Sequence, residues 1–151
     1  MSAGASDADE VHGSAVAVDG RGLLILGPSG AGKSRLAVEL LALGAGLVAD
    51  DRVRIAPGTP PVLAAPGRWP GLLEVRGLGL LRAPRAGPVP CSAVLDLGRP
   101  GSGRLPRHGT TTLAGAEVTC LRWGDGRPYA AALMLYLRCN CEMDPADIHE
   151  P

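Results

Sequence analysis

The sequence predicts an α/β fold with a mixed sheet, and three stretches of the chain carry that prediction. Residues 14–18 and 22–26 are apolar runs of strand length, and the Asp-Gly pair between them is typical of a hairpin turn. A glycine-rich loop and a helical pattern at residues 34–43 follow directly. The apolar run at 47–49 then ends in two aspartates. We therefore expect an antiparallel hairpin that leads into the loop, a helix and a further strand.

The glycine-rich loop matches the phosphate-binding pattern G-x-x-x-x-G-K-[ST] at every fixed position. Glycines let the backbone turn so that successive N–H groups point at phosphate oxygens. The lysine would reach the terminal phosphates of ATP, and the last hydroxyl would bind Mg²⁺. The alternative is a chance glycine-rich turn between a strand and a helix. We predict a P-loop that consists of Gly27, Pro28, Ser29, Gly30, Ala31, Gly32, Lys33 and Ser34.

Two adjacent carboxylates, Asp50 and Asp51, follow the apolar run at 47–49. A helix of about ten residues spans roughly 15 Å, enough to return the chain alongside the sheet after Gly44 ends the helix. The acidic pair is then expected at the same strand-end edge as the P-loop. A Walker B position needs such a carboxylate to act on Mg²⁺, directly or through water. A solvated acidic turn is the alternative.

A weaker pattern lies at residues 72–81, where Glu74 and Arg76 are two positions apart. Residues with this spacing share one face of a strand, which Gly77 and Gly79 would then break or bulge. An exposed ion pair on an edge strand would give the same pattern. The rest of the chain predicts strands at 93–97 and 117–123.

The last predicted element is an apolar helix at residues 129–139, with Pro128 at its first position. We expect residues 1–10 to be a disordered tail, residues 11–141 to be one P-loop domain, and residues 142–151 to be a flexible acidic tail.

Composition narrows the possible partners and location of the chain. Among its 151 residues, Lys plus Arg equals Asp plus Glu, which argues against a nucleic-acid footprint or a polybasic membrane surface. There is no signal-peptide pattern and no apolar run of membrane-spanning length. The four cysteines are Cys91, Cys120, Cys139 and Cys141. Their spacing does not fit an ordinary zinc site with His149, so we expect reduced thiols and a cytoplasmic protein.

Four blocks of the sequence, in this order, resemble the catalytic domain of HPr kinase/phosphorylase. They are Val-His-Gly at 11–13, the P-loop at 27–34, Leu-Val-Ala-Asp-Asp at 47–51 and Glu-Val-Arg-Gly-Leu-Gly-Leu at 74–80. The resemblance implies a P-loop domain of the HPr kinase/PEP carboxykinase type in a short form without the usual N-terminal domain. It also implies ATP and Mg²⁺ as cofactors, a serine of the phosphocarrier protein HPr as acceptor, and a homo-oligomer, possibly a hexamer.

The same resemblance assigns roles to residues in these blocks. Lys33 matches the phosphate-binding lysine, and Ser34 and Glu74 match Mg²⁺-binding positions. The pair Asp50 and Asp51 supplies the proton acceptor for the substrate serine, with Asp51 favoured and Asp50 also a candidate metal ligand.

Three further catalytic candidates also come from the resemblance. His12 matches the active-site histidine of the family, and Arg76 belongs to the block that contains Glu74. Arg104 is the candidate for the later catalytic arginine. The family's late Pro-Gly-Arg-Asn loop, tied to dephosphorylation, corresponds here to Asp-Gly-Arg-Pro at 125–128. Because Asp125 places a carboxylate where an anion would approach, we expect weak or absent phosphorylase activity.

Two other functions fit the same motifs. A small-molecule P-loop kinase could use the glycine- and arginine-rich loop at 98–107 as a lid. A regulator could sense nucleotide without transferring phosphate. The acidic pair favours catalysis, and the short chain favours the regulator.

Overall fold

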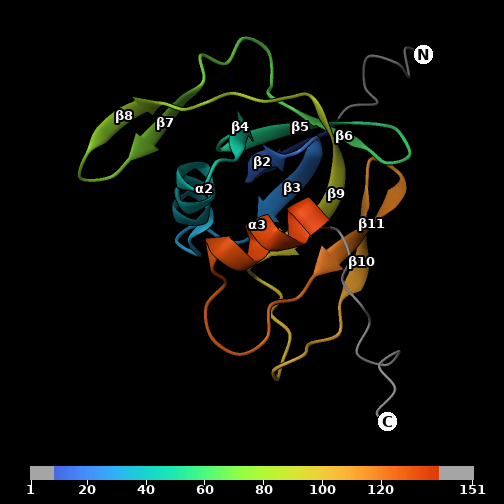
Figure 1. Ribbon diagram of the computed structural model, residues 1–151. Helices are drawn as coiled ribbons and strands as arrows, with labels where there is room; N and C mark the ends of the chain where they lie inside the picture. The colour runs from blue at the N-terminus through green and yellow to red at the C-terminus, as the bar shows by residue number, and fades with distance from the viewer. Residues whose placement is uncertain (1–8, 140–151) are drawn as a thin grey trace.

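The computed structural model describes residues 9–139 of the 151-residue chain. Strands build a mixed sheet, and the two helices, α2 (Lys33–Ala42) and α3 (Ala130–Cys139), pack together on one of its faces (Figure 1). The strands are β1 (Asp9–His12), β2 (Ser14–Val18), β3 (Arg21–Leu26), β4 (Gly46–Ala49), β5 (Arg52–Ala56), β6 (Val62–Ala64), β7 (Leu72–Val75), β8 (Gly79–Arg82), β9 (Val89–Asp96), β10 (Gly109–Leu113) and β11 (Ala116–Leu121).

The order of the strands brings four strand ends to one edge of the sheet. Strand β3 pairs with β9 in parallel and with β2 antiparallel, and β2 pairs antiparallel with β4. Strand β11 runs parallel to β9. It follows that β3, β4, β9 and β11 all run in one direction, so their carboxyl ends meet at the same edge, where α/β proteins bind ligands.

The predicted hairpin into the glycine-rich loop is confirmed. Asp19 and Gly20 have φ angles of 51° and 78°, and the flanking residues Val18 and Arg21 pair across the turn. Positive φ at both central positions suits the right-handed twist of the two strands. This short turn fixes the register in which β2 delivers the chain to β3.

Helix α2 ends as the sequence predicts. The Gly44 N–H donates to the Leu41 carbonyl at 3.1 Å, and the Ala45 N–H donates to the Leu40 carbonyl at 3.0 Å. Gly44 has a φ of 111°, which a glycine adopts without strain. The sharp stop turns the chain back into β4.

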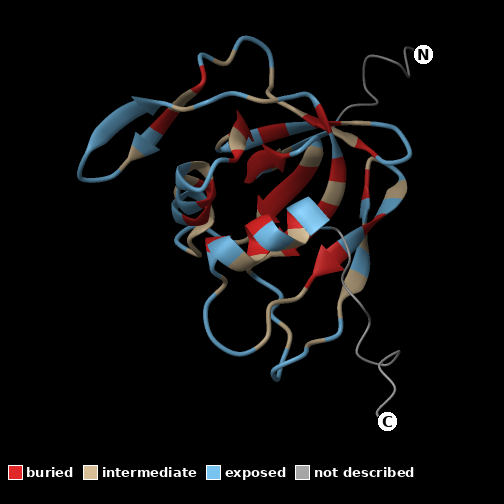
Figure 2. Ribbon diagram, viewed as in Figure 1, coloured by how far each residue is buried: buried red, intermediate tan, exposed pale blue. Residues whose placement is uncertain are grey.

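The core has two parts, one on each face of the sheet. On one face, alternate residues of β2 and β3 pack against the apolar sides of α2 and α3. On the other face, the intervening residues pack with side chains from β5, β6, β10 and β11. Figure 2 shows the buried positions concentrated in the central strands, whereas the β7–β8 hairpin is exposed at its tip. Among the described residues, no helix is long and apolar enough to cross a membrane.

Several element boundaries differ from the sequence prediction. Strand β1 begins at Asp9, so Asp9 and Glu10 pair with β5 instead of belonging to the tail. Strand β10 was not predicted, and α3 begins at Ala130, two residues after Pro128. The C-terminal tail at 142–151 and the Cys141–His149 zinc alternative lie outside the described residues.

The expectation that Glu74 and Arg76 share one strand face is wrong. Strand β7 ends at Val75, and Arg76 lies in the turn that connects β7 to β8. Gly77, with a φ of 89°, forms part of this turn, so the chain folds back as a hairpin instead of continuing as a bulged strand. Glu74 therefore lies on strand β7, and Arg76 lies in the β7–β8 turn.

Candidate functional site

The glycine-rich loop joins the end of β3 to the start of α2. Gly30 and Gly32 have φ angles of 83° and 102°, a region that disfavours other residues. A Cβ added to Gly27 would lie 3.0 Å from the Leu97 Cβ, so glycine lets the loop pack against the end of β9. No side chain caps the amino end of α2, so its first backbone N–H groups are available to an anion.

Lys33, the only lysine in the sequence, folds back over this loop. Its Nζ donates hydrogen bonds to the carbonyls of Gly27 at 2.7 Å and Pro28 at 3.1 Å. The ammonium group is therefore held above the loop backbone, beside the N–H groups that would face a phosphate.

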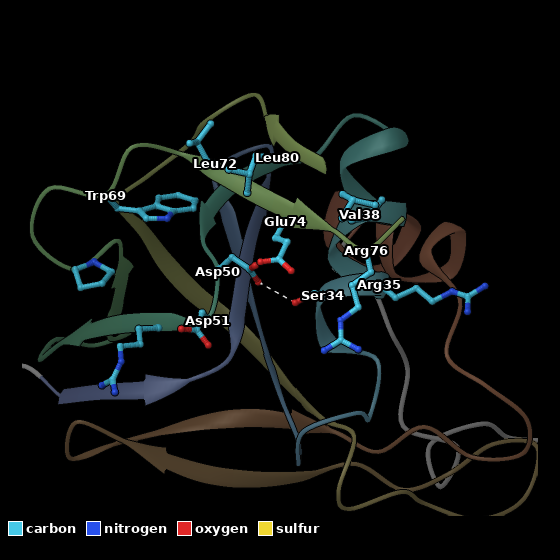
Figure 3. A pocket seen from close by; sticks show the side chains of 13 residues that line it. Ser34, Arg35, Val38, Asp50, Asp51, Trp69, Leu72, Glu74, Arg76 and Leu80 are labelled. Atoms are coloured by element: carbon cyan, nitrogen blue, oxygen red, sulfur yellow. Dashed lines mark hydrogen bonds between the residues drawn. The ribbon is translucent and has the colours of Figure 1, made fainter. Parts of the chain in front are cut away.

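Asp50 connects the end of β4 to the loop. The Ser34 Oγ donates to Asp50 Oδ1 at 3.2 Å, and the Ser14 Oγ donates to the same oxygen at 2.6 Å. Figure 3 shows Ser34 and Asp50 pointing toward each other across the mouth of the loop. The predicted meeting of the acidic pair and the loop at one sheet edge is confirmed.

Ser14 is a residue that sequence reasoning missed. It is 1 % exposed, at the start of the apolar strand β2, and its hydroxyl orients Asp50. The available signal was a lone hydroxyl at the end of a buried run, which needs a hydrogen-bond partner.

Asp51 lies one residue further along and is exposed. It has a φ of 70°, uncommon for a residue other than glycine, and its carbonyl accepts the Gly13 N–H at 3.1 Å. A Cβ on Gly13 would lie 2.7 Å from the Ile25 carbonyl oxygen, so only glycine fits there. The backbone of the β1–β2 junction thus fixes the position of Asp51.

A large cavity, of about 1100 Å³, opens beside this acidic pair. The β7–β8 hairpin forms one wall and contributes Glu74 and Arg76, and the apolar Trp69 lies nearby (Figure 3). The lining residues are Ser34, Arg35, Val38, Asp50, Asp51, Arg52, Pro66, Trp69, Leu72, Glu74, Val75, Arg76 and Leu80. The cavity thus combines three carboxylates with three arginines and an apolar side.

The oxygens at this cavity suit a hard cation. No three His, Cys, Asp or Glu side chains within residues 9–139 are grouped closely enough to hold a metal by themselves. Mg²⁺ is commonly bound by one or two carboxylates together with substrate phosphates and water. Ser34, Asp50 and Glu74 line one cavity and offer this kind of donor set.

Outside the glycine-rich loop, two of the predicted catalytic residues, His12 and Arg104, do not line this cavity. His12 is exposed on β1 and lies opposite Arg52 in the pairing with β5, near the acidic pair along the backbone. Arg104 lines a separate cavity of about 560 Å³ between α3 and the loops at 103–108 and 121–125. The structure therefore does not bring Arg104 into the cavity that Ser34 lines.

Asp125 also lines that separate cavity. Its carboxylate accepts the Gly103 N–H at 3.1 Å, and its own N–H donates to the Gly103 carbonyl at 3.0 Å. The expectation that Asp125 places a carboxylate where an incoming anion would approach therefore has no support in this arrangement. The proposed lid loop is likewise docked on the end of β11, because the Gly101 N–H donates to the Trp123 carbonyl at 2.7 Å.

The described cysteines are all free thiols. Burial raises the pKa of Cys91 to about 12, and it also raises the pKa of Cys120. These two thiols stay protonated at neutral pH and are poor nucleophiles. The free thiols at the described positions agree with the sequence expectation of reduced cysteines.

The fold and the site together define an α/β protein with a mixed sheet and a candidate phosphate-binding site. A glycine-rich loop and carboxylates form this site at one strand-end edge of the sheet. The HPr Serine kinase C-terminal domain model matches residues 4–86, which include the loop, the acidic pair and Glu74. The chain belongs to this family. The match ends before β9, so Arg104 and Asp125 lie beyond it.

Curated relatives match about half of the chain. The HPr kinase/phosphorylase of Bordetella pertussis is 53% identical over 73 residues, which cover 47% of this chain and 24% of that protein. That of Aromatoleum aromaticum is 50% identical over 80 residues, covering 50% of this chain and 25% of the relative. The aligned segment thus spans about a quarter of the length of these relatives.

A solved structure extends the likeness of fold to most of the chain. The Hpr(Ser) kinase/phosphatase from Coxiella burnetii superposes with a TM-score of 0.73 at 21% sequence identity. The alignment covers 87% of this chain and 90% of that structure. The shared fold therefore extends beyond residue 86, where the match to the family model ends.

Proposed function

We propose that this chain is an ATP-dependent protein kinase that transfers the γ-phosphoryl group to a serine of HPr. The observation that carries the proposal is the hydrogen bond of 3.2 Å between Ser34 and Asp50, which joins the glycine-rich loop to a carboxylate. Family membership supplies the acceptor. Nucleotide sensing alone would not require the second carboxylate, Asp51, beside this pair.

The side chains have distinct roles in this proposal. Backbone N–H groups of the loop and Lys33 hold the phosphates, while Ser34, Asp50 and Glu74 hold Mg²⁺. The metal would neutralise charge on the phosphates. Positioning and charge neutralisation account for most of the catalysis of phosphoryl transfer, so this donor set suffices without a covalent intermediate.

Asp51 is the proposed base. It is exposed at the cavity, so an acceptor serine can approach it from solvent. The serine oxygen attacks the γ-phosphorus, its proton passes to the Asp51 carboxylate, and the bond between the γ-phosphorus and the bridging oxygen breaks to release ADP. Arg76, at the end of the β7–β8 hairpin, lines the same cavity, and its proposed role is to contact the transferring group or the acceptor.

The experiment is transfer of label from γ-labelled ATP to HPr by the wild type, Asp51→Asn and Asp19→Asn. Both aspartates have positive φ, but Asp19 lies in the β2–β3 turn, so it is a matched control for the backbone. General base catalysis contributes about 100-fold or more, and we expect Asp51→Asn to lose transfer by that factor while it retains ATP binding. Equal rates for the two variants would remove Asp51 from the mechanism, and no transfer by the wild type would reject the function.

Further features of the family remain proposals for this chain. We propose that residues 11–141 form the kinase domain, that the protein works in the cytoplasm, and that it assembles as a homo-oligomer, possibly a hexamer. Weak phosphorylase activity also stays a prediction, now resting on the altered loop at 125–128 and not on the charge of Asp125. Release of phosphate or pyrophosphate from serine-phosphorylated HPr measures it.

A further inference from the structure

Residues of the glycine-rich loop line two cavities of different character. Ser34 lines the large cavity that contains the acidic pair. Ala31 and Gly32, on the same loop, line a second cavity of about 210 Å³. Arg35, in the first turn of α2, lines both. A molecule whose phosphates rest on the loop can therefore extend into either cavity.

The second cavity lacks the concentration of acid found in the first. Its carboxylate is Glu39, which lies 3.9 Å from the Arg35 guanidinium in an exposed ion pair. Leu36 and Leu97 supply apolar surface, and Arg127 and Tyr129 approach from the segment before α3. The cavity thus offers apolar and aromatic surface and a cation next to the loop.

The chemistry of transfer fixes which end of a nucleotide enters each cavity. The reacting phosphate has to lie beside Asp50 and Asp51, and hence toward the large cavity. With its phosphates on the loop, the nucleotide can then extend its sugar and base into the second cavity, which Ala31 and Gly32 line. The third cavity has no lining residue from the glycine-rich loop, so it offers no anchor for phosphates.

Tyr129 lines the second cavity and also the third, and its ring contacts a second aromatic ring. Tyr129 is 59% exposed. Its ring nevertheless contacts the Trp123 ring edge to face, with the ring centroids 5.4 Å apart and an interplanar angle of 76°. Such a contact orients a ring at little conformational cost. An exposed, oriented aromatic ring is the kind of surface on which nucleotide bases stack.

We propose that the second cavity receives the nucleoside end of the nucleotide, with the base stacked on Tyr129 and Arg127 beside the phosphate or sugar oxygens. This assignment rests on the proposed function, because it takes the acidic cavity as the reacting side. It identifies a base-binding residue outside the segment matched by the family model.

The test compares Mg²⁺-ATP with inorganic tripolyphosphate in equilibrium binding to the wild type and three variants. Tyr129→Ala removes the ring, Tyr129→Phe keeps it, and Leu135→Ala truncates an exposed side chain of α3 that lines none of the three cavities. Stacking on one aromatic residue changes base affinity by about tenfold. We expect Tyr129→Ala to weaken ATP binding about tenfold, with tripolyphosphate binding unchanged and both other variants like the wild type.

The possible failures have different meanings. Unchanged ATP binding by Tyr129→Ala, or equal loss of ATP and tripolyphosphate binding, would overturn the base assignment while leaving the kinase proposal intact. The base assignment would also be overturned if the wild type bound ATP and tripolyphosphate with equal affinity. If the wild type bound neither compound, both this assignment and the proposed function would be rejected.

Discussion

At the scale of single residues, the site depends on one carboxylate oxygen. Asp50 Oδ1 accepts from Ser34 on the loop and from the buried Ser14 on β2. Two donors to one oxygen hold the carboxylate in one orientation and leave its second oxygen for another ligand. Glu74 comes from a different element, strand β7, so its proposed contribution to Mg²⁺ binding can be tested separately from that of Asp50.

Replacing Glu74 by Gln should raise the Mg²⁺ concentration needed for half-maximal transfer by about tenfold, which corresponds to about 1.4 kcal/mol. The reason is the loss of a charged oxygen ligand for a hard cation. Titration of Mg²⁺ at saturating ATP measures the change. Glu117→Gln on β11 is the control, because that carboxylate accepts from Thr110 at 3.0 Å and is absent from the cavity. An Mg²⁺ dependence identical to the wild type would exclude Glu74 from the metal site.

At the scale of elements, the β7–β8 hairpin is held in place by the segment that follows it. The Leu47 N–H of β4 donates to the Pro84 carbonyl at 2.7 Å, and the Ala86 N–H donates back to the Leu47 carbonyl at 3.0 Å. The Arg85 guanidinium lies 5.5 Å from the centre of the Trp69 ring, which also lines the large cavity. The hairpin that carries Glu74 is thus tied to the edge of the sheet.

Gly71, just before β7, provides a test of this attachment. It has a φ of 77°, and a Cβ there would lie 2.5 Å from the Arg85 Cδ. Gly67→Ala is the matched control, because Gly67 has a φ of 48° and nothing within 4 Å of the added atom. Both variants should lose about 1 kcal/mol of unfolding free energy from the backbone conformation.

Only Gly71→Ala is expected to displace Arg85 and thereby lower the transfer rate beyond this loss of stability. Denaturant unfolding and transfer assays on the two variants measure the effects separately. Equal activity of the two variants would show that the attachment does not position the hairpin for transfer.

At the scale of the whole molecule, the local part of the fold could be predicted from the sequence. The hairpin, the glycine-rich loop, α2 and β4 follow one another along the chain, and turn and helix-end residues specify each step. The meeting of Ser34 with Asp50 then follows from strand direction alone.

The remaining features depend on contacts between distant segments. Strand β1 forms because β5 lies beside it, and Arg104 lies where the loop after β9 docks on the end of β11. No periodicity within these segments specifies such contacts. Ser14 was missed for the same reason, because its partner lies 36 residues away.

The most direct measurement of the central claim is the mass of HPr after incubation with Mg²⁺-ATP and either the wild type or Lys33→Ala. Lys33 is the only lysine of the chain, so no other ammonium side chain can replace its charge. The account predicts one added phosphate on a serine of HPr with the wild type and none with the variant, whose ATP binding is also weakened. Unmodified HPr with the wild type, or equal phosphorylation by Lys33→Ala, would contradict it.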